Sequence, residues 1–140
     1  MAHSFLKNRG AFAFTFHDRL AFFGLDGKDL KMVQFGNKNL KAKSIPEIMN
    51  NGNNTCYYYS CFANDKYVYA IYRESANDSN QSQISYLEQY DWNGNPVTRY
   101  PLPEEHGFYS GCATDNDSVI YLIDYYNDHF LHKVKLEISK

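Results

Sequence analysis

The sequence is poor in cysteine, and its three cysteines do not form a metal-binding or disulfide pattern. Cys56, Cys61 and Cys112 are an odd number and lack the Cys-x-x-Cys pairs of a zinc ribbon. They also lack the density of a small scaffold held together by disulfides. Cys56 and Cys61 are five positions apart, which on a regular strand puts them on opposite faces. We therefore expect reduced thiols, no bound metal and no cofactor.

Long apolar runs and an excess of charge of one sign are also missing. No apolar stretch approaches the ~20 residues needed to span a bilayer as a helix, and residues 1–10 lack the apolar stretch of a signal peptide. With 14 Lys and Arg against 16 Asp and Glu, the formal net charge is −2, and the basic residues are scattered. This excludes the electrostatic footprint of a protein that binds nucleic acid or an anionic membrane. As written, the chain is expected in the cytoplasm, without a membrane span.

Aromatic residues, by contrast, are abundant. The 140 residues include 13 Tyr and 10 Phe, which favour pleated, half-buried surfaces over helices. A chain of this length is about one domain and can bury roughly two-thirds of its unfolded surface. We expect a single all-β domain spanning residues 1–140.

Two stretches predict β-hairpins. Residues 87–102, LEQYDWNGNPVTRYPL, alternate apolar and polar residues on both sides of Asn93-Gly94, a dipeptide suited to the positive φ angles of a tight two-residue turn. Residues 20–35 repeat this pattern around Asp26-Gly27. Further strands are expected at residues 4–6 and 11–17, and one helical turn is expected after Pro46.

The hairpins belong to a longer repeat. Superimposing Gly27 on Gly94 pairs Leu25 with Trp92, and residues 116–121 match residues 64–69. Units of about four strands that recur along a chain are typical of a β-propeller. The sequence predicts a partial β-propeller of about three antiparallel four-stranded meanders, over residues 4–35, 56–102 and 108–138. The third of these units has only three recognisable strands.

The same segments resemble a known family. The stretches NRGAFAFTFHDRLAFFGLDGK, LEQYDWNGNPVTRYPL and GCATDNDSVIYLI, followed by a basic and apolar final strand, resemble the C-terminal half of a bacterial TolB-like six-bladed β-propeller family of unknown function. The resemblance covers nearly the whole chain. It implies a fragment of a full propeller whose full-length members are exported or lipid-anchored, and it brings no catalytic residues. The chain departs from the family in lacking an export signal and an N-terminal half.

Candidate ligand-binding residues are aromatic. Tyr57, Tyr58, Trp92 and Tyr125 can form a stacking platform for a carbohydrate or another flat ligand, because each ring offers an apolar face and a polar tip. The alternative is that these rings pack one blade against the next. No catalytic residue and no metal ligand is assigned. His129 and His132 are three apart and point to opposite faces of a strand, so they do not form a metal pair.

The function expected from these features is a non-catalytic binding or scaffold module of propeller type. One alternative is a hydrolase or lyase that acts at a propeller channel with some of His17, His106 and Asp124. A second alternative is a small β-barrel that holds a ligand. The expected partners are a protein or carbohydrate ligand and further copies of the chain. A three-blade piece leaves one apolar face bare at each end, and the edge strand near residues 130–136 can accept residues 4–6 of a partner.

Overall fold

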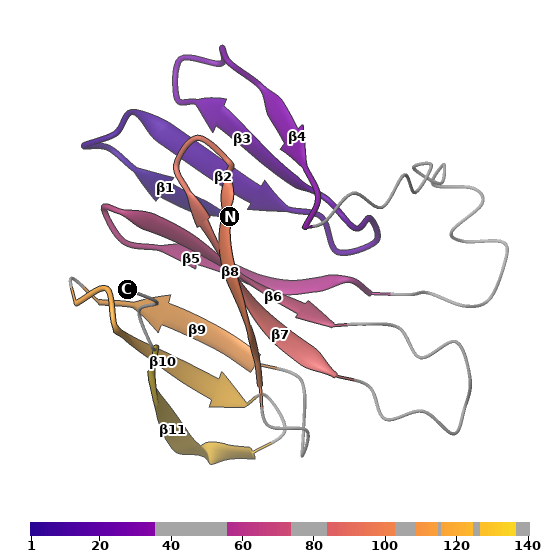
Figure 1. Cartoon of the computed structure of the whole chain (residues 1–140), viewed down its shortest axis with the longest axis vertical. Coiled ribbons are helices and arrows are strands. Elements are labelled where there is room, and N and C mark those ends of the chain that lie inside the picture. Colours follow the sequence, from indigo (N-terminus) through magenta and orange to yellow (C-terminus); the bar gives the residue numbers. More distant parts are fainter. Residues whose placement is uncertain (36–55, 74–83, 103–108, 115, 125–126, 137–140) are drawn as a thin grey trace, which may run out of the picture.

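The structure, a computed structural model, describes residues 1–35, 56–73, 84–102, 109–114, 116–124 and 127–136 (Figure 1). At positions 112 and 127–130 it describes the backbone alone. The described residues form eleven β-strands, and none of them forms a helix long and apolar enough to cross a membrane. The all-β class is confirmed. The helical turn expected after Pro46 falls outside the described residues.

The strands form three separate antiparallel sheets, and each sheet is a meander in chain order. Blade 1 consists of β1 (Ala2–Ser4), β2 (Arg9–Ala13), β3 (Leu20–Gly24) and β4 (Lys31–Val33). Blade 2 consists of β5 (Tyr58–Ala63), β6 (Tyr67–Arg73), β7 (Ser85–Asp91) and β8 (Pro96–Pro101). Blade 3 consists of β9 (Tyr109–Ala113), β10 (Val119–Asp124) and β11 (Asn127–Lys135). The partial propeller is confirmed. The closed β-barrel is wrong, because no sheet of the described residues closes on itself.

Blade 2 lies between the other two blades (Figure 1). The first strands of the blades are in contact, since β5 touches both β1 and β9. This stacking of successive meanders is the arrangement of propeller blades.

The second strand of blade 2, β6, is buried on both faces. Val68, Tyr69, Ala70 and Ile71 are each 0% exposed. Val68 and Ala70 belong to the hydrophobic cluster between blades 1 and 2, whereas Tyr69 and Ile71 belong to the cluster between blades 2 and 3. A strand covered on both sides needs apolar residues at every position, which explains the unbroken run in its sequence. Full burial of one such side chain contributes about 1.5–3 kcal/mol.

The turn between β7 and β8 contains three residues, not two. The N–H of Gly94 donates to the carbonyl of Asp91 at 3.0 Å, and the N–H of Asp91 donates to the carbonyl of Asn95 at 3.0 Å. Gly94 has φ +75°, and Asn93 is not among the residues with positive φ. The predicted turn is therefore present, but Trp92, Asn93 and Gly94 form it as a type I turn with a glycine bulge. Trp92 is 6% exposed, so its ring is buried in the packing of one blade against the next.

The turn between β3 and β4 repeats this geometry. The N–H of Gly27 donates to the carbonyl of Gly24 at 2.9 Å, the N–H of Gly24 donates to the carbonyl of Lys28 at 2.7 Å, and Gly27 has φ +80°. The predicted pairing of Leu25 with Trp92 is confirmed at the level of the backbone. Leu25 is nevertheless 39% exposed, because none of the three described blades covers its turn.

Two predicted strands of blade 1 differ from the observed ones. The strand expected at residues 4–6 is Ala2–Ser4, and Phe5 lies in the following turn and is 81% exposed. The strand expected at residues 11–17 ends at Ala13. Ala11 is fully buried while Phe12 is 42% exposed. The small residue faces blade 2 because large tyrosines from blade 2 already fill that space.

We expect Gly94→Ala to destabilise the fold more than Gly27→Ala. Both glycines have positive φ, where an alanine costs on the order of 1 kcal/mol. A Cβ at Gly94 would also lie 3.0 Å from the Phe22 ring, whereas a Cβ at Gly27 meets nothing within 4 Å. Urea denaturation of both variants measures the difference. Equal losses of stability would contradict the close packing of the β7–β8 turn on blade 1.

Candidate functional site

Polar side chains gather in two places, and the first is a closed cluster between blades 1 and 2. Glu88 of β7 is 0% exposed. Its Oε2 accepts hydrogen bonds from the hydroxyls of Tyr58 and Tyr90, both at 2.8 Å. Its Oε1 accepts from Nε of Arg99 at 3.1 Å and also from Nη2. Arg99 lies directly opposite Glu88 on β8, so the strand register brings the two charges together.

Three aromatic rings surround the Arg99 guanidinium. Its central carbon lies 4.5 Å from the ring centre of Phe35, 4.9 Å from that of Tyr72 and 4.7 Å from that of Tyr86. A guanidinium at this distance from a ring face gains cation–π attraction, which grows as water is excluded. The rings and the carboxylate together hold Arg99 between the two sheets.

Burial dominates the titration of this cluster. It raises the pKa of Glu88, although the hydrogen bonds from Arg99 and from both tyrosines oppose that shift. Burial and the neighbouring Glu88 both raise the pKa of Tyr58 and of Tyr90, so the two hydroxyls remain donors. A general acid or base must reach a substrate proton, and this carboxyl is enclosed by its own partners. The cluster is therefore structural.

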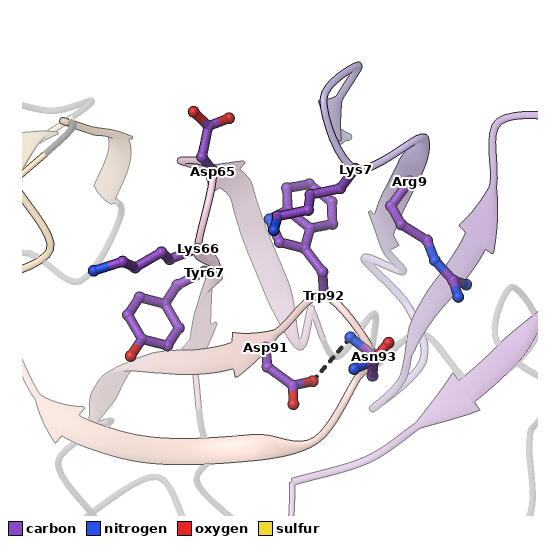
Figure 2. A pocket seen from close by; sticks show the side chains of 8 residues that line it. All are labelled: Lys7, Arg9, Asp65, Lys66, Tyr67, Asp91, Trp92 and Asn93. Carbon is purple, nitrogen blue, oxygen red and sulfur yellow. Dashed lines mark hydrogen bonds between the residues drawn. The ribbon is translucent and has the colours of Figure 1, made fainter.

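The second place is an open depression of about 460 Å³ at the turn end of blades 1 and 2 (Figure 2). Blade 1 contributes residues of its β1–β2 connection, and blade 2 contributes residues of its β5–β6 and β7–β8 turns. The lining residues are Lys7, Arg9, Asp65, Lys66, Tyr67, Asp91, Trp92 and Asn93. Figure 2 shows Lys7 and Arg9 on one side of the site and Asp65, Lys66 and Tyr67 on the other.

Several lining groups are engaged in the fold. Oδ1 of Asp91 accepts from the N–H groups of Asn93 and Asn95, both at 2.9 Å. Burial alone would raise the pKa of Asp91, but hydrogen bonds from Asn95 and Asn93 outweigh it and lower the pKa. Lys66 forms an ion pair with Asp117 of blade 3. The indole N–H of Trp92 donates to the carbonyl of Asn64 at 3.0 Å.

The remaining charged groups are open to a ligand. Lys7 is exposed, and no residue of the described ranges pairs with its ammonium. Arg9 is partly exposed and lies 4.0 Å from Asp29, a long and weak ion pair. Asp65 is exposed, and its carboxylate has only the Ser4 hydroxyl at 3.5 Å among the described residues. The depression therefore offers two cations from blade 1 and one carboxylate from blade 2.

Of the predicted ligand-binding aromatics, Tyr58 and Trp92 belong to the hydrophobic cluster between blades 1 and 2, and Tyr57 packs against it. Tyr58 is 1% exposed, and its hydroxyl donates to Glu88 in the closed polar cluster. The ring of Tyr57 stacks on that of Tyr72, with the ring centres 6.4 Å apart. Trp92 lines the depression, but almost all of its indole packs between blades 1 and 2. Tyr125 lies outside the described residues.

The two described residues of the catalytic alternative lie on different blades. His17 is in the β2–β3 connection of blade 1, Asp124 is buried at the end of β10 in blade 3, and His106 falls outside the described residues. Within the described ranges, no three His, Cys, Asp or Glu side chains are placed to share a metal ion. Cys56 and Cys61 are free thiols, as expected, and burial raises the pKa of Cys61 to about 11.

No protein-family model matches this chain, and neither a curated protein nor a solved structure does. What the depression can do follows from its own side chains. Two cations beside a carboxylate can bind a charged ligand through charge-assisted hydrogen bonds. Sequence reasoning did not single out Lys7, Arg9 or Asp65, because the first two belong to blade 1 and the third to blade 2, and only the packing of the blades brings them together.

We expect Glu88→Gln to remove a pH dependence of stability. Because burial raises the pKa of Glu88, the folded protein binds this proton more tightly than the unfolded chain does. The resulting stability is fully present below the ordinary pKa of 4.5 and is lost as the pH rises through the raised pKa. Urea denaturation across this pH range should show the stability of the wild type falling relative to that of the glutamine variant.

Glu88→Leu is the comparison variant. It removes the carboxylate that accepts from Tyr58, Tyr90 and Arg99, and should cost on the order of 3 kcal/mol at all pH values. A leucine variant as stable as the wild type would contradict the structural role of the cluster.

Proposed function

We propose that this chain is a non-catalytic binding module of β-propeller type, and that its ligand is an acidic segment of a partner protein. The observation that carries the proposal is the depression that Lys7 and Arg9 of blade 1 line together with Asp65 of blade 2. Kinship with the TolB-like six-bladed propellers is part of the proposal. The three consecutive, stacked meanders and the two matching glycine turns support it.

A peptide fits this site better than a carbohydrate. Sugar recognition by stacking needs an exposed aromatic face. Trp92 is 6% exposed, and its N–H is already bonded to Asn64. Tyr67 also lines the depression, but its ring is partly buried against the cluster between blades 2 and 3. The accessible charged groups are an ammonium, a guanidinium and a carboxylate, which pair with charged peptide side chains. Because the cations outnumber the free carboxylate, the favoured ligand is acidic.

A binding role also fits better than catalysis. The described lining contains no histidine, cysteine or serine, and Asp91 is held by the turn that it caps. The remaining carboxylate, Asp65, is exposed, and its one hydrogen-bond partner among the described residues is the Ser4 hydroxyl at 3.5 Å.

The test is a titration followed by amide NMR. The probe is a pentapeptide of alternating glutamate and serine with blocked ends, and its glutamine counterpart is the neutral control. We expect the acidic peptide to shift the amide signals of Lys7, Arg9 and Asp65, and added salt to weaken its binding. Lys7→Glu should weaken binding by at least about tenfold.

The matched control variant is Lys28→Glu. Lys28 is an exposed lysine of blade 1 that does not line the depression, so its substitution changes the net charge by the same amount. This variant should bind the acidic peptide almost as the wild type does. Equal losses in the Lys7 and Lys28 variants, or equal binding of the glutamine peptide, would contradict the proposed site.

A further inference from the structure

The two interfaces inside the chain are built from equivalent positions. Leu87 lies opposite Ile71 in blade 2, and Leu131 lies opposite Ile123 in blade 3. In blade 1 the residue equivalent to Leu87, by superposition of the two glycine turns, is Leu20. We call the sheet face that carries these leucines the leading face of each blade, and the opposite face its trailing face.

Two of the three leading faces are covered and one is bare. Leu20 is 0% exposed because blade 2 covers it, and Leu87 and Ile71 are 0% exposed because blade 3 covers them. In blade 3 the same positions are open, with Ile123 47% exposed and Leu131 61% exposed. Blade 3 therefore repeats an interface surface that the chain uses twice, and no described residue covers it.

Blade 1 exposes the matching trailing face. Phe12 is 42% exposed and Met32 is 45% exposed, and Phe23 lies on the same face and is partly buried. The equivalents of Met32 and Ala21 in blade 2 are Arg99 and Glu88, since both pairs lie opposite each other in register. The trailing face of blade 1 thus has apolar residues at the positions where the trailing face of blade 2 has its buried charged pair.

The internal interfaces show which residues would meet. Leu20 of one leading face shares a cluster with Ala70 of the next trailing face, and Leu87 shares a cluster with Leu122. The position that Ala70 and Leu122 occupy is held by Phe12 in blade 1, because Phe12 lies opposite Ala21 as Ala70 lies opposite Glu88. Leu131 of blade 3 is therefore the counterpart for Phe12.

A lysine adds a second point of complementarity. Phe22 of blade 1 and Tyr90 of blade 2 meet across the first interface with ring centres 5.8 Å apart. The equivalent residues on the bare faces are Lys133 of blade 3, which is exposed, and Phe23 of blade 1. A lysine stem over a phenylalanine ring gains apolar and cation–π contact.

We propose that the leading face of blade 3 docks on the trailing face of blade 1 of a second copy of this chain. As far as the described residues go, each copy carries one bare face of each kind, so two copies satisfy both faces at once about a two-fold axis. The contact is sheet face on sheet face. It does not exchange residues 4–6, because β1 already pairs with β2 through Ser4 and Arg9. It also leaves out Lys7, so it is independent of the peptide site.

Light scattering coupled to size exclusion at micromolar concentration is the test. We expect a wild-type mass of twice the 16.3 kDa chain. Leu131→Glu and Phe12→Lys should each give a folded monomer, because both contacts of the dimer then bury an unpaired charge. Val97→Glu is the matched control. Val97 is 50% exposed on β8, outside both faces, and this variant should remain dimeric.

Mixing the two monomeric variants separates docking from misfolding. In a mixed pair, one contact joins the introduced glutamate to the introduced lysine, and the other is the native contact between Leu131 and Phe12. The dimer should therefore return in the mixture. A folded wild-type monomer, or a mixture that stays monomeric, would overturn the proposal.

Discussion

The burial of β6 on both faces is the constraint on which the rest of the structure depends. Its residues alternate between two clusters, so Val68 and Ala70 need blade 1 while Tyr69 and Ile71 need blade 3. A strand that exposes either set would lose several kilocalories of hydrophobic stabilisation. The three sheets therefore stack in chain order. This stacking brings the β1–β2 connection of blade 1 next to the β5–β6 and β7–β8 turns of blade 2, where the depression lies.

The Glu88 cluster sets how blade 1 sits on blade 2. A buried carboxylate and guanidinium are costly unless every partner is in place, so the cluster tolerates little displacement of the two sheets. Across the interface, Arg99 of blade 2 contacts the ring of Phe35, which follows the last strand of blade 1. At the other end the Trp92 turn packs against Phe22, and these contacts place the turns that form the depression.

The proposed activities use different surfaces of one architecture. The depression lies where turns of neighbouring blades meet, so its charges are held by the interface beneath them. The bare faces are the trailing face of blade 1 and the leading face of blade 3, which lie at the two ends of the stack of described sheets. Turns can vary in charge without disturbing the sheets, which makes them suitable for recognition, whereas the faces must remain apolar to pack.

The sequence alone determined the strands, the glycine turns and their repeat, because alternation and positive φ are local properties. The strand predicted from Ala11 was too long. Phenylalanines at positions 12, 14 and 16 alternate and therefore indicate a buried face, but tyrosines of blade 2 fill the space that such a face would need. Only the tertiary structure brought Glu88 to Arg99 and its tyrosines, and Lys7 to Asp65. These residues are distant in sequence or lie on different elements, and their encounter depends on strand register and on blade packing, which no local pattern records.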